Sequence, residues 1–367
     1  MPKILRLHCF VLFAATAASS VQAENDTPQY VSGSIVVPGA SVGEEKLESF
    51  SPKLADRYLA NGALAWCREH RCVTCHTTGS YLAIRPSLTA QLGPPERELR
   101  ELFVKELNDL STKADAELHV GATPTQIAYV AWGLAEWDKH VTKGRSAETD
   151  QALELLFRCQ QEEDGSWGND DCWPPLESSY YHGTTVAAMA VATAPGWLEQ
   201  IADEPTTKRV EKLKTYLRTT TPPHDYGRLL LLWTSSRFAD LLDEAAVQEL
   251  IELVFSHQRE DGGWSMRTLA DPEQWGNGSR AEKIRQEEDF DNPASDGHLT
   301  GLAIITLRDA GISSIDPRIQ YAVGWLRQNQ RVSGRWWTRS LNNDSDHYIT
   351  FSSTAYALLA LAKCDAF

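Results

Sequence analysis

The chain has 367 residues, 42% of them hydrophobic and 23% charged, which is enough for one large globular domain or two small ones. Acidic residues outnumber basic ones by 50 to 35, so the formal net charge is −15 at pH 7. Nucleic acid and anionic membrane surfaces are poor partners for so negative a protein.

Residues 1–23 are typical of a secretory signal peptide. Lys3 and Arg6 precede an apolar run over residues 10–18, and residues 21–23 match a small-residue cleavage site. Removing this segment, which contains no acidic residue, takes the net charge from −15 to −17. No later run is long and apolar enough to cross a bilayer. We therefore expect a periplasmic or secreted protein that is not an integral membrane protein.

Residues 24–50 contain proline, glycine and serine with little periodicity, and we expect them to form an extended arm. In the rest of the chain, three segments share one pattern: an aromatic residue, a glutamine three residues later, and a turn with glycine and tryptophan. Such repeats predict a fold that uses one unit several times. The three sets are Phe157, Gln160 and Trp167; Phe255, Gln258 and Trp264; and Trp325, Gln328 and Trp336.

This pattern resembles the QW repeat of the squalene-hopene cyclase and oxidosqualene cyclase family, whose fold is an α/α toroid. The resemblance implies that each glutamine and tryptophan hold the end of an outer helix to the turn that follows it. It also implies a terpenoid cyclase- or prenyltransferase-like ring whose central cavity takes a small-molecule or lipid ligand.

Each of the three turns is preceded by an amphipathic helix and followed by an apolar one rich in small residues, as the outer and inner rings of a toroid require. With weaker signals included, six such pairs are found, which is enough to close a ring. We therefore predict an all-α fold, a single (α/α)6 toroid over residues 51–367. The inner helices are expected to begin near Thr78, Thr123, Gly183, Tyr226, Gly297 and Ser352, and the outer ones near Pro52, Pro95, Glu148, Thr206, Glu244 and Pro317.

The most specific chemical signal is Cys72-Val-Thr-Cys75-His76. Two cysteines separated by two residues and followed at once by histidine are typical of a c-type haem attachment site. The two thiols would add to the haem vinyl groups, and His76 would be the axial iron ligand. There are two alternatives: a Cys72–Cys75 disulfide, or half of a zinc site. A zinc site would need a second Cys or His pair at comparable spacing.

The motif falls within the repeat. When Trp66 is aligned with Phe157, Glu69 takes the place of the glutamine and His76 takes the place of Trp167. Because all inner helices of a toroid begin on the same rim, we expect the motif at the mouth of the central cavity. Candidates for a second iron ligand on that rim are His182, His298, His347 and Met266, of which His298 is favoured because it opens an inner helix. A Cys159–Cys172 disulfide is also expected there.

The acid that starts triterpene cyclisation lies in an Asp-x-Asp-Asp motif, and this sequence has none. A cyclase would need another acid, for which Asp296 is the candidate. Aromatic residues on inner helices could line the cavity and stabilise carbocations: Tyr129, Trp132, Trp233 and Tyr356.

Three functions remain open at this point. The first is an exported toroid with covalent haem c that serves electron transfer, with a redox partner protein, or oxidises a ligand in the cavity. The second is a terpenoid cyclase-like isomerase. The third is a toroid without catalytic activity that binds a lipid or a protein.

Overall fold

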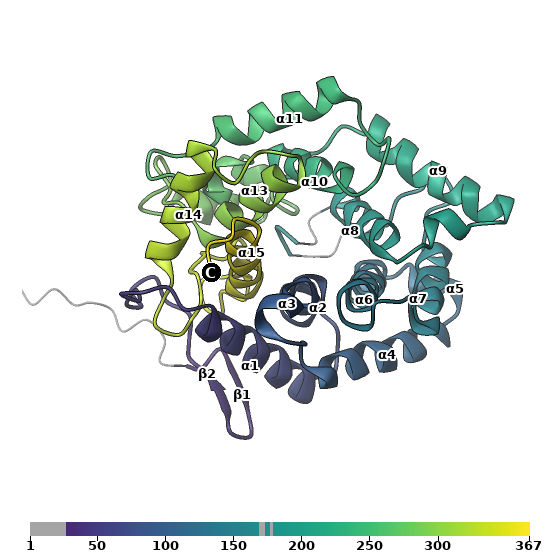
Figure 1. The fold of residues 1–367 in the computed structure, drawn as a ribbon, viewed down its shortest axis with the longest axis horizontal. Helices are drawn as coiled ribbons and strands as arrows, with labels where there is room; N and C mark the ends of the chain where they lie inside the picture. The colour runs from purple at the N-terminus through teal and green to yellow at the C-terminus, as the bar shows by residue number, and fades with distance from the viewer. Residues whose placement is uncertain (1–26, 169–172, 177–178) are drawn as a thin grey trace, which may run out of the picture.

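The computed structural model describes residues 27–168, 173–176 and 179–367, and the predicted signal peptide at 1–23 lies outside them. The described chain forms a ring of helices in two layers (Figure 1). This arrangement confirms the predicted all-α toroid. The outer layer consists of α1 (Pro52–His70), α4 (Arg97–Ser111), α7 (Ala147–Arg158), α9 (Glu204–Thr219), α11 (Glu244–Ser256) and α14 (Pro317–Asn329).

The inner layer begins with a π-helical turn, η1 (Cys75–Gly79), that leads into α2 (Ser80–Ile84). After α2 come the 3-10 turn η2 (Arg85–Leu88) and α3 (Thr89–Leu92). The other inner helices are α6 (Thr123–Trp137), α8 (Tyr180–Thr193), α10 (Asp225–Ser235), α13 (Gly297–Asp309) and α15 (Ile349–Lys363). Contacts between neighbours give the order α2, α6, α8, α10, α13 and α15, with α15 returning to α2.

Side chains at the helix starts explain where many of these elements begin. The N-cap residues of several outer helices accept a hydrogen bond from a backbone N–H in the first turn, which satisfies a group that the helix itself leaves unpaired. These caps are Ser51, Ser146, Asp203, Asp243 and Asp316. The inner helices are apolar on all sides because both faces are covered: every residue of α13 from Gly297 to Leu307 is buried.

Three tryptophans tie the two layers together. Trp167, Trp264 and Trp336 are at most 1% exposed, and each indole Nε1 donates to a carbonyl near the end of the preceding outer helix, at 2.7–2.9 Å. Each tryptophan backbone N–H also donates to a threonine hydroxyl on the following inner helix. Those threonines are Thr184, Thr300 and Thr354.

A glutamine joins consecutive outer helices at each of these turns. Gln160 Nε2 donates to the carbonyls of Gly165 and Arg209, and Gln258 Nε2 donates to those of Gly262 and Arg318. At the third turn the residue that makes these contacts is Gln330.

The prediction of Gln328 at the third turn is wrong. Gln330 Nε2 donates to the carbonyls of Gly334 and Ser51, both at 2.9 Å, and its Oε1 accepts from Ser51 N at 2.7 Å. Gln328 is exposed on α14. Counting three residues from Trp325 gave the wrong glutamine because α14 continues to Asn329 and the joining residue lies just beyond its end. Gln330 thus closes the ring, since Ser51 caps the first outer helix.

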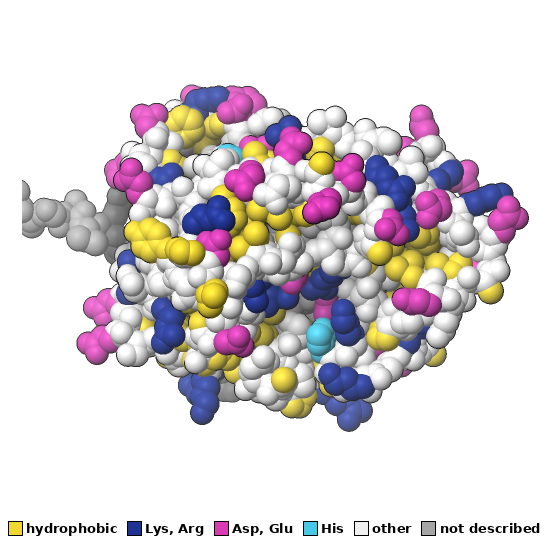
Figure 2. All heavy atoms as spheres, turned by 45° about the horizontal axis from the view of Figure 1, so that its top comes forward, with side chains coloured by type: hydrophobic (Ala, Val, Ile, Leu, Met, Phe, Trp, Pro, Cys, Tyr) yellow, Lys and Arg dark blue, Asp and Glu magenta, His cyan; other side chains and the backbone are white. Residues whose placement is uncertain are grey.

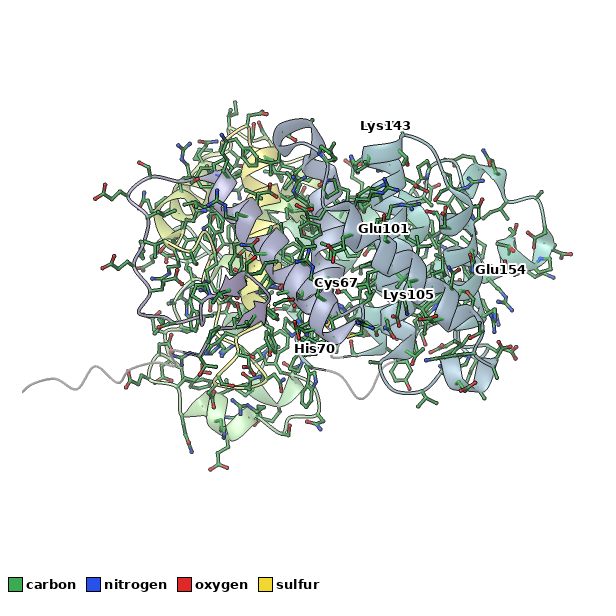
Figure 3. The ribbon with its side chains drawn as sticks, turned by 90° about the horizontal axis from the view of Figure 1, so that it is seen from below. Cys67, His70, Glu101, Lys105, Lys143 and Glu154 are labelled. Atoms are coloured by element: carbon green, nitrogen blue, oxygen red, sulfur yellow. The ribbon has the colours of Figure 1, made fainter. Side chains whose placement is uncertain are left out.

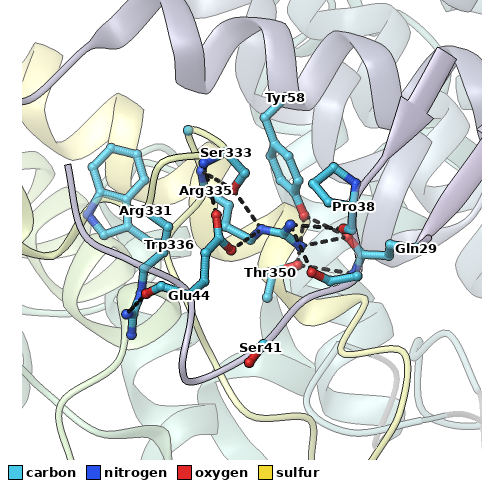
Figure 4. Close-up of polar contacts among 12 residues, drawn as sticks. Gln29, Pro38, Ser41, Glu44, Tyr58, Arg331, Ser333, Arg335, Trp336 and Thr350 are labelled. Carbon is cyan, nitrogen blue, oxygen red and sulfur yellow. Dashed lines mark hydrogen bonds and ion pairs between the residues drawn. The ribbon is translucent and has the colours of Figure 1, made fainter. Parts of the chain in front are cut away.

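The segment before α1 packs on this closure. It contains a two-stranded antiparallel hairpin that the sequence did not predict, β1 (Tyr30–Ser32) and β2 (Ile35–Val37), with Tyr30 opposite Val37. Arg335 is fully buried at the junction (Figure 4), where its Nε lies 2.9 Å from Glu44 Oε2 and its Nη2 donates to Pro38 O at 2.8 Å. The N-terminal segment therefore packs over the junction between the last outer helix, α14, and the first, α1.

No helix in the described part of the chain is long and apolar enough to cross a membrane.

Candidate functional site

The Cys72–His76 segment lies where the first outer helix passes into the first inner one. Arg71, with a φ of 52°, ends α1, and η1 begins three residues after Cys72. Figure 3 shows His70, at the end of α1, and Lys143, just beyond α6, at opposite edges of the ring. The segment is therefore on the rim where the inner helices start.

Thr74, and not His76, occupies the tryptophan position of this first turn. Thr74 N donates to Thr78 Oγ1 at 3.0 Å, the same contact that the tryptophan N–H groups make elsewhere. The predicted alignment of His76 with Trp167 is thus wrong by two residues. The cause is the shorter connection after the helix: Thr74 follows the end of α1 by four residues, whereas Trp167 follows the end of α7 by nine.

The imidazole of His76 is held by polar contacts on one side. Its Nδ1 lies 2.6 Å from Thr77 Oγ1, which in turn lies 2.8 Å from the hydroxyl of Tyr30. Burial and, to a smaller extent, the nearby His70 together lower the pKa of His76 to about 4. At neutral pH the ring is uncharged, the form that binds metal ions.

Two aromatic rings fix the plane of this imidazole. Tyr348 stacks on it, with 5.0 Å between ring centroids and 12° between planes, and Trp66 meets it edge-on at 5.0 Å. Tyr30 also stacks on Tyr348, at 5.4 Å. Tyr30 and Tyr348 could not be predicted as partners of His76, because they belong to opposite ends of the chain.

Cys72 and Cys75 are not joined by a disulfide, so the disulfide alternative is wrong for this structure. Cys72 is partly exposed, and its Sγ accepts from Trp66 Nε1 at 3.4 Å, whereas Cys75 is only 6% exposed. Burial raises the pKa of the Cys72 thiol. Among the described residues, no group of three or more His, Cys, Asp and Glu side chains could hold a metal ion.

The other described cysteines are buried free thiols as well: Cys67, Cys159 and Cys364. Cys159 Sγ lies 4.0 Å from the carbonyl of Leu118. Its predicted disulfide partner, Cys172, lies outside the described residues.

The contacts of His298 argue against its prediction as the second iron ligand. His298 is fully buried; its Nε2 lies 3.0 Å from Tyr226 Oη and its Nδ1 lies 2.9 Å from Ser352 Oγ. Both ring nitrogens are therefore engaged within the inner layer.

The remaining candidates for that ligand are also buried under the loops of this rim. His347 Nδ1 accepts from Ser340 N at 3.1 Å, and His182 Nε2 lies 3.3 Å from Tyr129 Oη. Met266 is completely buried.

Asp296 caps an inner helix. Its Oδ1 accepts from Leu299 N at 2.9 Å and from Thr338 Oγ1 at 3.2 Å, and its Oδ2 accepts from Met266 N at 2.6 Å. Burial raises the pKa of its carboxyl, while the N–H groups of Met266 and Leu299 oppose this change. These contacts give Asp296 a structural role at the start of α13. Its role as a catalytic acid stays a prediction.

Aromatic side chains meet inside the ring. Trp132 on α6 contacts Trp233 on α10 with 5.6 Å between centroids, and Trp233 contacts Tyr356 on α15 at 6.0 Å. Neither pair of helices is adjacent in the ring, so these rings reach one another across its interior. These side chains therefore occupy part of the interior in which the sequence predicts a cavity.

A buried ion pair that the sequence did not predict lies at the other end of the inner helices. Glu136 of α6 is 0% exposed and pairs with Arg237, which follows α10. A single acidic residue in the otherwise apolar run of α6 was the available signal.

No protein-family model matches the chain, and no curated protein matches it significantly. Among solved structures, two variants of the type II terpene cyclase MstE from Scytonema, both in complex with geranylgeranyl dihydroxybenzoate, superpose with TM-scores of 0.43 and 0.45. Each is 13% identical to this chain. Each match covers 86% of this chain and 99% of the MstE chain. A similarity at this level assigns neither an activity nor a substrate.

Proposed function

We propose that this chain is an exported c-type haem protein in which Cys72 and Cys75 hold the haem through thioether bonds and His76 is the axial ligand. The observation that carries the proposal is the contact of His76 Nδ1 with Thr77 Oγ1. Histidines that bind metals usually donate their second ring N–H to a neighbouring acceptor. The Thr77 hydroxyl can accept from Nδ1–H, and in that tautomer Nε2 is left as the ligand. No contact to His76 Nε2 is found within the described ranges.

The surroundings of His76 suit this role further. The stacked Tyr348 and the edge-on Trp66 restrict rotation of the imidazole about its side-chain bonds. Thr77 is itself tied to Tyr30 Oη, so the orientation of the ring depends on the N-terminal hairpin as well. These contacts would hold the imidazole in one orientation if it bound a haem iron.

The burial of Cys75 has a consequence for the order of assembly. Cys75 is 6% exposed and begins η1, so its sulfur would have to react before the first inner helix packs. Haem attachment would then precede completion of the ring. When bound, the haem iron supplies one-electron redox chemistry to a partner protein or to a ligand near this rim.

The test is production of the chain, with its own signal segment, in a host that attaches c-type haem. We expect a coloured protein whose haem stays with the polypeptide after denaturation, and a mass increased by one haem. The double variant Cys72→Ala/Cys75→Ala should lose the covalent haem. Cys67→Ala is the matched control, because Cys67 is a buried cysteine near the end of α1 that forms no disulfide, and this variant should keep the haem. A colourless protein with two alkylatable thiols at Cys72 and Cys75 would refute the proposal.

The second candidate is a terpenoid cyclase-like isomerase or lipid-binding toroid. It is favoured by the aromatic interior, since the rings of Trp132, Trp233 and Tyr356 could stabilise a cation. Incubation with polyprenyl substrates, including the geranylgeranyl dihydroxybenzoate named for MstE, tests this candidate. An unchanged rate in Asp296→Asn would exclude that residue as the acid.

A further inference from the structure

A cavity of about 430 Å³ lies where the inner helices end, on the face opposite to the Cys72–His76 segment. Figure 2 shows a hollow in this face, with basic side chains and a histidine around it. Its walls come from the ends of several inner helices, and its volume lies in the range of small-molecule sites. The lining residues are Ser87, Leu88, Gln91, Lys139, His140, Ser236, Arg237, Asp309, Leu359, Ala362 and Lys363.

Two buried or half-buried carboxylates next to the cavity already have partners. Glu136 Oε1 accepts from Trp132 Nε1 at 2.9 Å and pairs with Arg237 Nη1. Asp309 Oδ2 accepts from Trp233 Nε1 at 3.1 Å, and its Oδ1 pairs with Lys363. The carboxylates therefore neutralise Arg237 and Lys363.

Positive charge remains after this pairing. Lys139 is exposed at the cavity and makes no ion pair with any described residue, and His140, 3.3 Å from Glu136 Oε2, adds a second positive charge when it is protonated. The carbonyl ends of the inner helices account for some attraction of cations to this face. They do not explain a cavity lined by more cations than carboxylates on a protein with a net charge of −15.

Arg237 keeps part of its guanidinium free. Its Nη1 contacts both Glu136 and Thr193 Oγ1, the latter at 3.1 Å, whereas Nε and Nη2 make no contact in the described part of the chain. Its guanidinium carbon lies 5.5 Å from the centroid of Trp233, which helps to hold the plane of the group. An arginine fixed in this way presents two parallel N–H groups, the arrangement that binds carboxylate or phosphate oxygens.

We propose that this cavity binds a small organic oxyanion, with one anionic group on Arg237 and its remaining charge near Lys139. The apolar part of such a ligand would contact Leu88, Leu359 and Ala362. Carboxylates and phosphates share the required chemistry, and the experiment below separates them. The proposal does not depend on haem attachment, because the two sites lie on opposite rims.

The test is isothermal titration calorimetry of the mature protein at low ionic strength, with succinate and with inorganic phosphate as separate probes. We expect one of them to bind with a Kd below about 1 mM and to weaken as NaCl is added. Binding of succinate alone identifies a carboxylate site, and binding of phosphate alone identifies a phosphate site.

Two variants test the named residues. Lys139→Met should weaken binding at least ~10-fold, and Arg237→Lys, which keeps the charge but loses the two parallel N–H groups, should weaken it similarly. Lys105→Met is the control, because Lys105 is an exposed lysine on the outer helix α4 (Figure 3), and its affinity should stay within about twofold of the parent. The proposal is overturned if neither probe binds, if Lys139→Met binds as tightly as the parent, or if Lys105→Met weakens binding equally.

Discussion

Replacing Arg237 with leucine tests the buried ion pair that joins α6 to α10 across the ring. Glu136 is 0% exposed, and the variant would leave its carboxylate with the Trp132 N–H and His140 as partners. Removing one member of a buried pair usually costs about 3–5 kcal/mol. Because His140, which is 29% exposed, stays 3.3 Å from Glu136 Oε2, we expect the lower end, about 3 kcal/mol.

This free energy converts to a modest change in melting temperature. The entropy of unfolding is about 2.1 cal/mol/K per residue, or ~0.75 kcal/mol/K for a chain of this size, so the Tm should fall by about 4 °C. Differential scanning calorimetry at pH 7 measures this change. The double variant Glu136→Gln/Arg237→Leu removes both charges and should recover most of the lost stability, because no unpaired charge remains buried.

The pH dependence gives a second check on the same pair. Burial raises the pKa of Glu136, but Arg237 and His140 outweigh burial and bring it to about 2, below its ordinary value of 4.5. Ionised Glu136 therefore stabilises the parent protein above pH 4.5, and this contribution is lost as the pH falls from 4.5 towards 2.

Without Arg237, burial should raise the pKa of Glu136 above 4.5, so protonation would stabilise the variant as the pH falls. The difference in Tm between the two proteins should consequently shrink between pH 7 and pH 4. The reasoning would be refuted if the Arg237→Leu variant had the same Tm as the parent at pH 7. It would also be refuted if the difference in Tm were the same at pH 7 and pH 4.

Two further predictions concern the closure of the ring. Gln330→Ala removes two hydrogen bonds to Ser51 at the start of α1 and one to Gly334 in the turn after α14, and urea unfolding should show a loss of about 2–4 kcal/mol. Gln328→Ala, on the exposed face of α14, should change stability by less than about 0.5 kcal/mol, and equal losses would contradict the assignment. Gly334 has a φ of 97°, and a Cβ there would lie 2.3 Å from the carbonyl oxygen of Leu54, so Gly334→Ala should cost more than about 2 kcal/mol. Gly324→Ala, at a helix position with open space, should instead stabilise by about 0.5–1 kcal/mol in the same measurement, and a loss there would contradict the account.

Much of the fold could be predicted because each inner helix carries its own local signal. The apolar run expected to begin at Gly297 does so, with Asp296 as its cap, and the outer helix expected from Pro317 begins at that residue. Periodicity and capping residues are properties of a short stretch of sequence, and they fix the start of an element without knowledge of its partners.

The site could be predicted only in part, because its contacts join distant segments. The Cys72–His76 motif was visible in five residues, but its packing depends on Tyr30 and Tyr348, which lie near opposite ends of the chain. Glu136 and Arg237 are 101 residues apart, and no pattern within either helix indicates the other. The wrong prediction of Gln328 in place of Gln330 has a related cause. Only the contact with Ser51, which is distant in sequence, distinguishes these two nearby glutamines.

The measurement that bears most directly on the proposed function is the absorbance spectrum of the mature protein after unfolding and extraction with acidified organic solvent. A polypeptide that retains a haem spectrum, and loses it when Cys72 and Cys75 are both replaced, is the result that the account predicts. A polypeptide without colour, or a pigment that passes completely into the solvent, would contradict it.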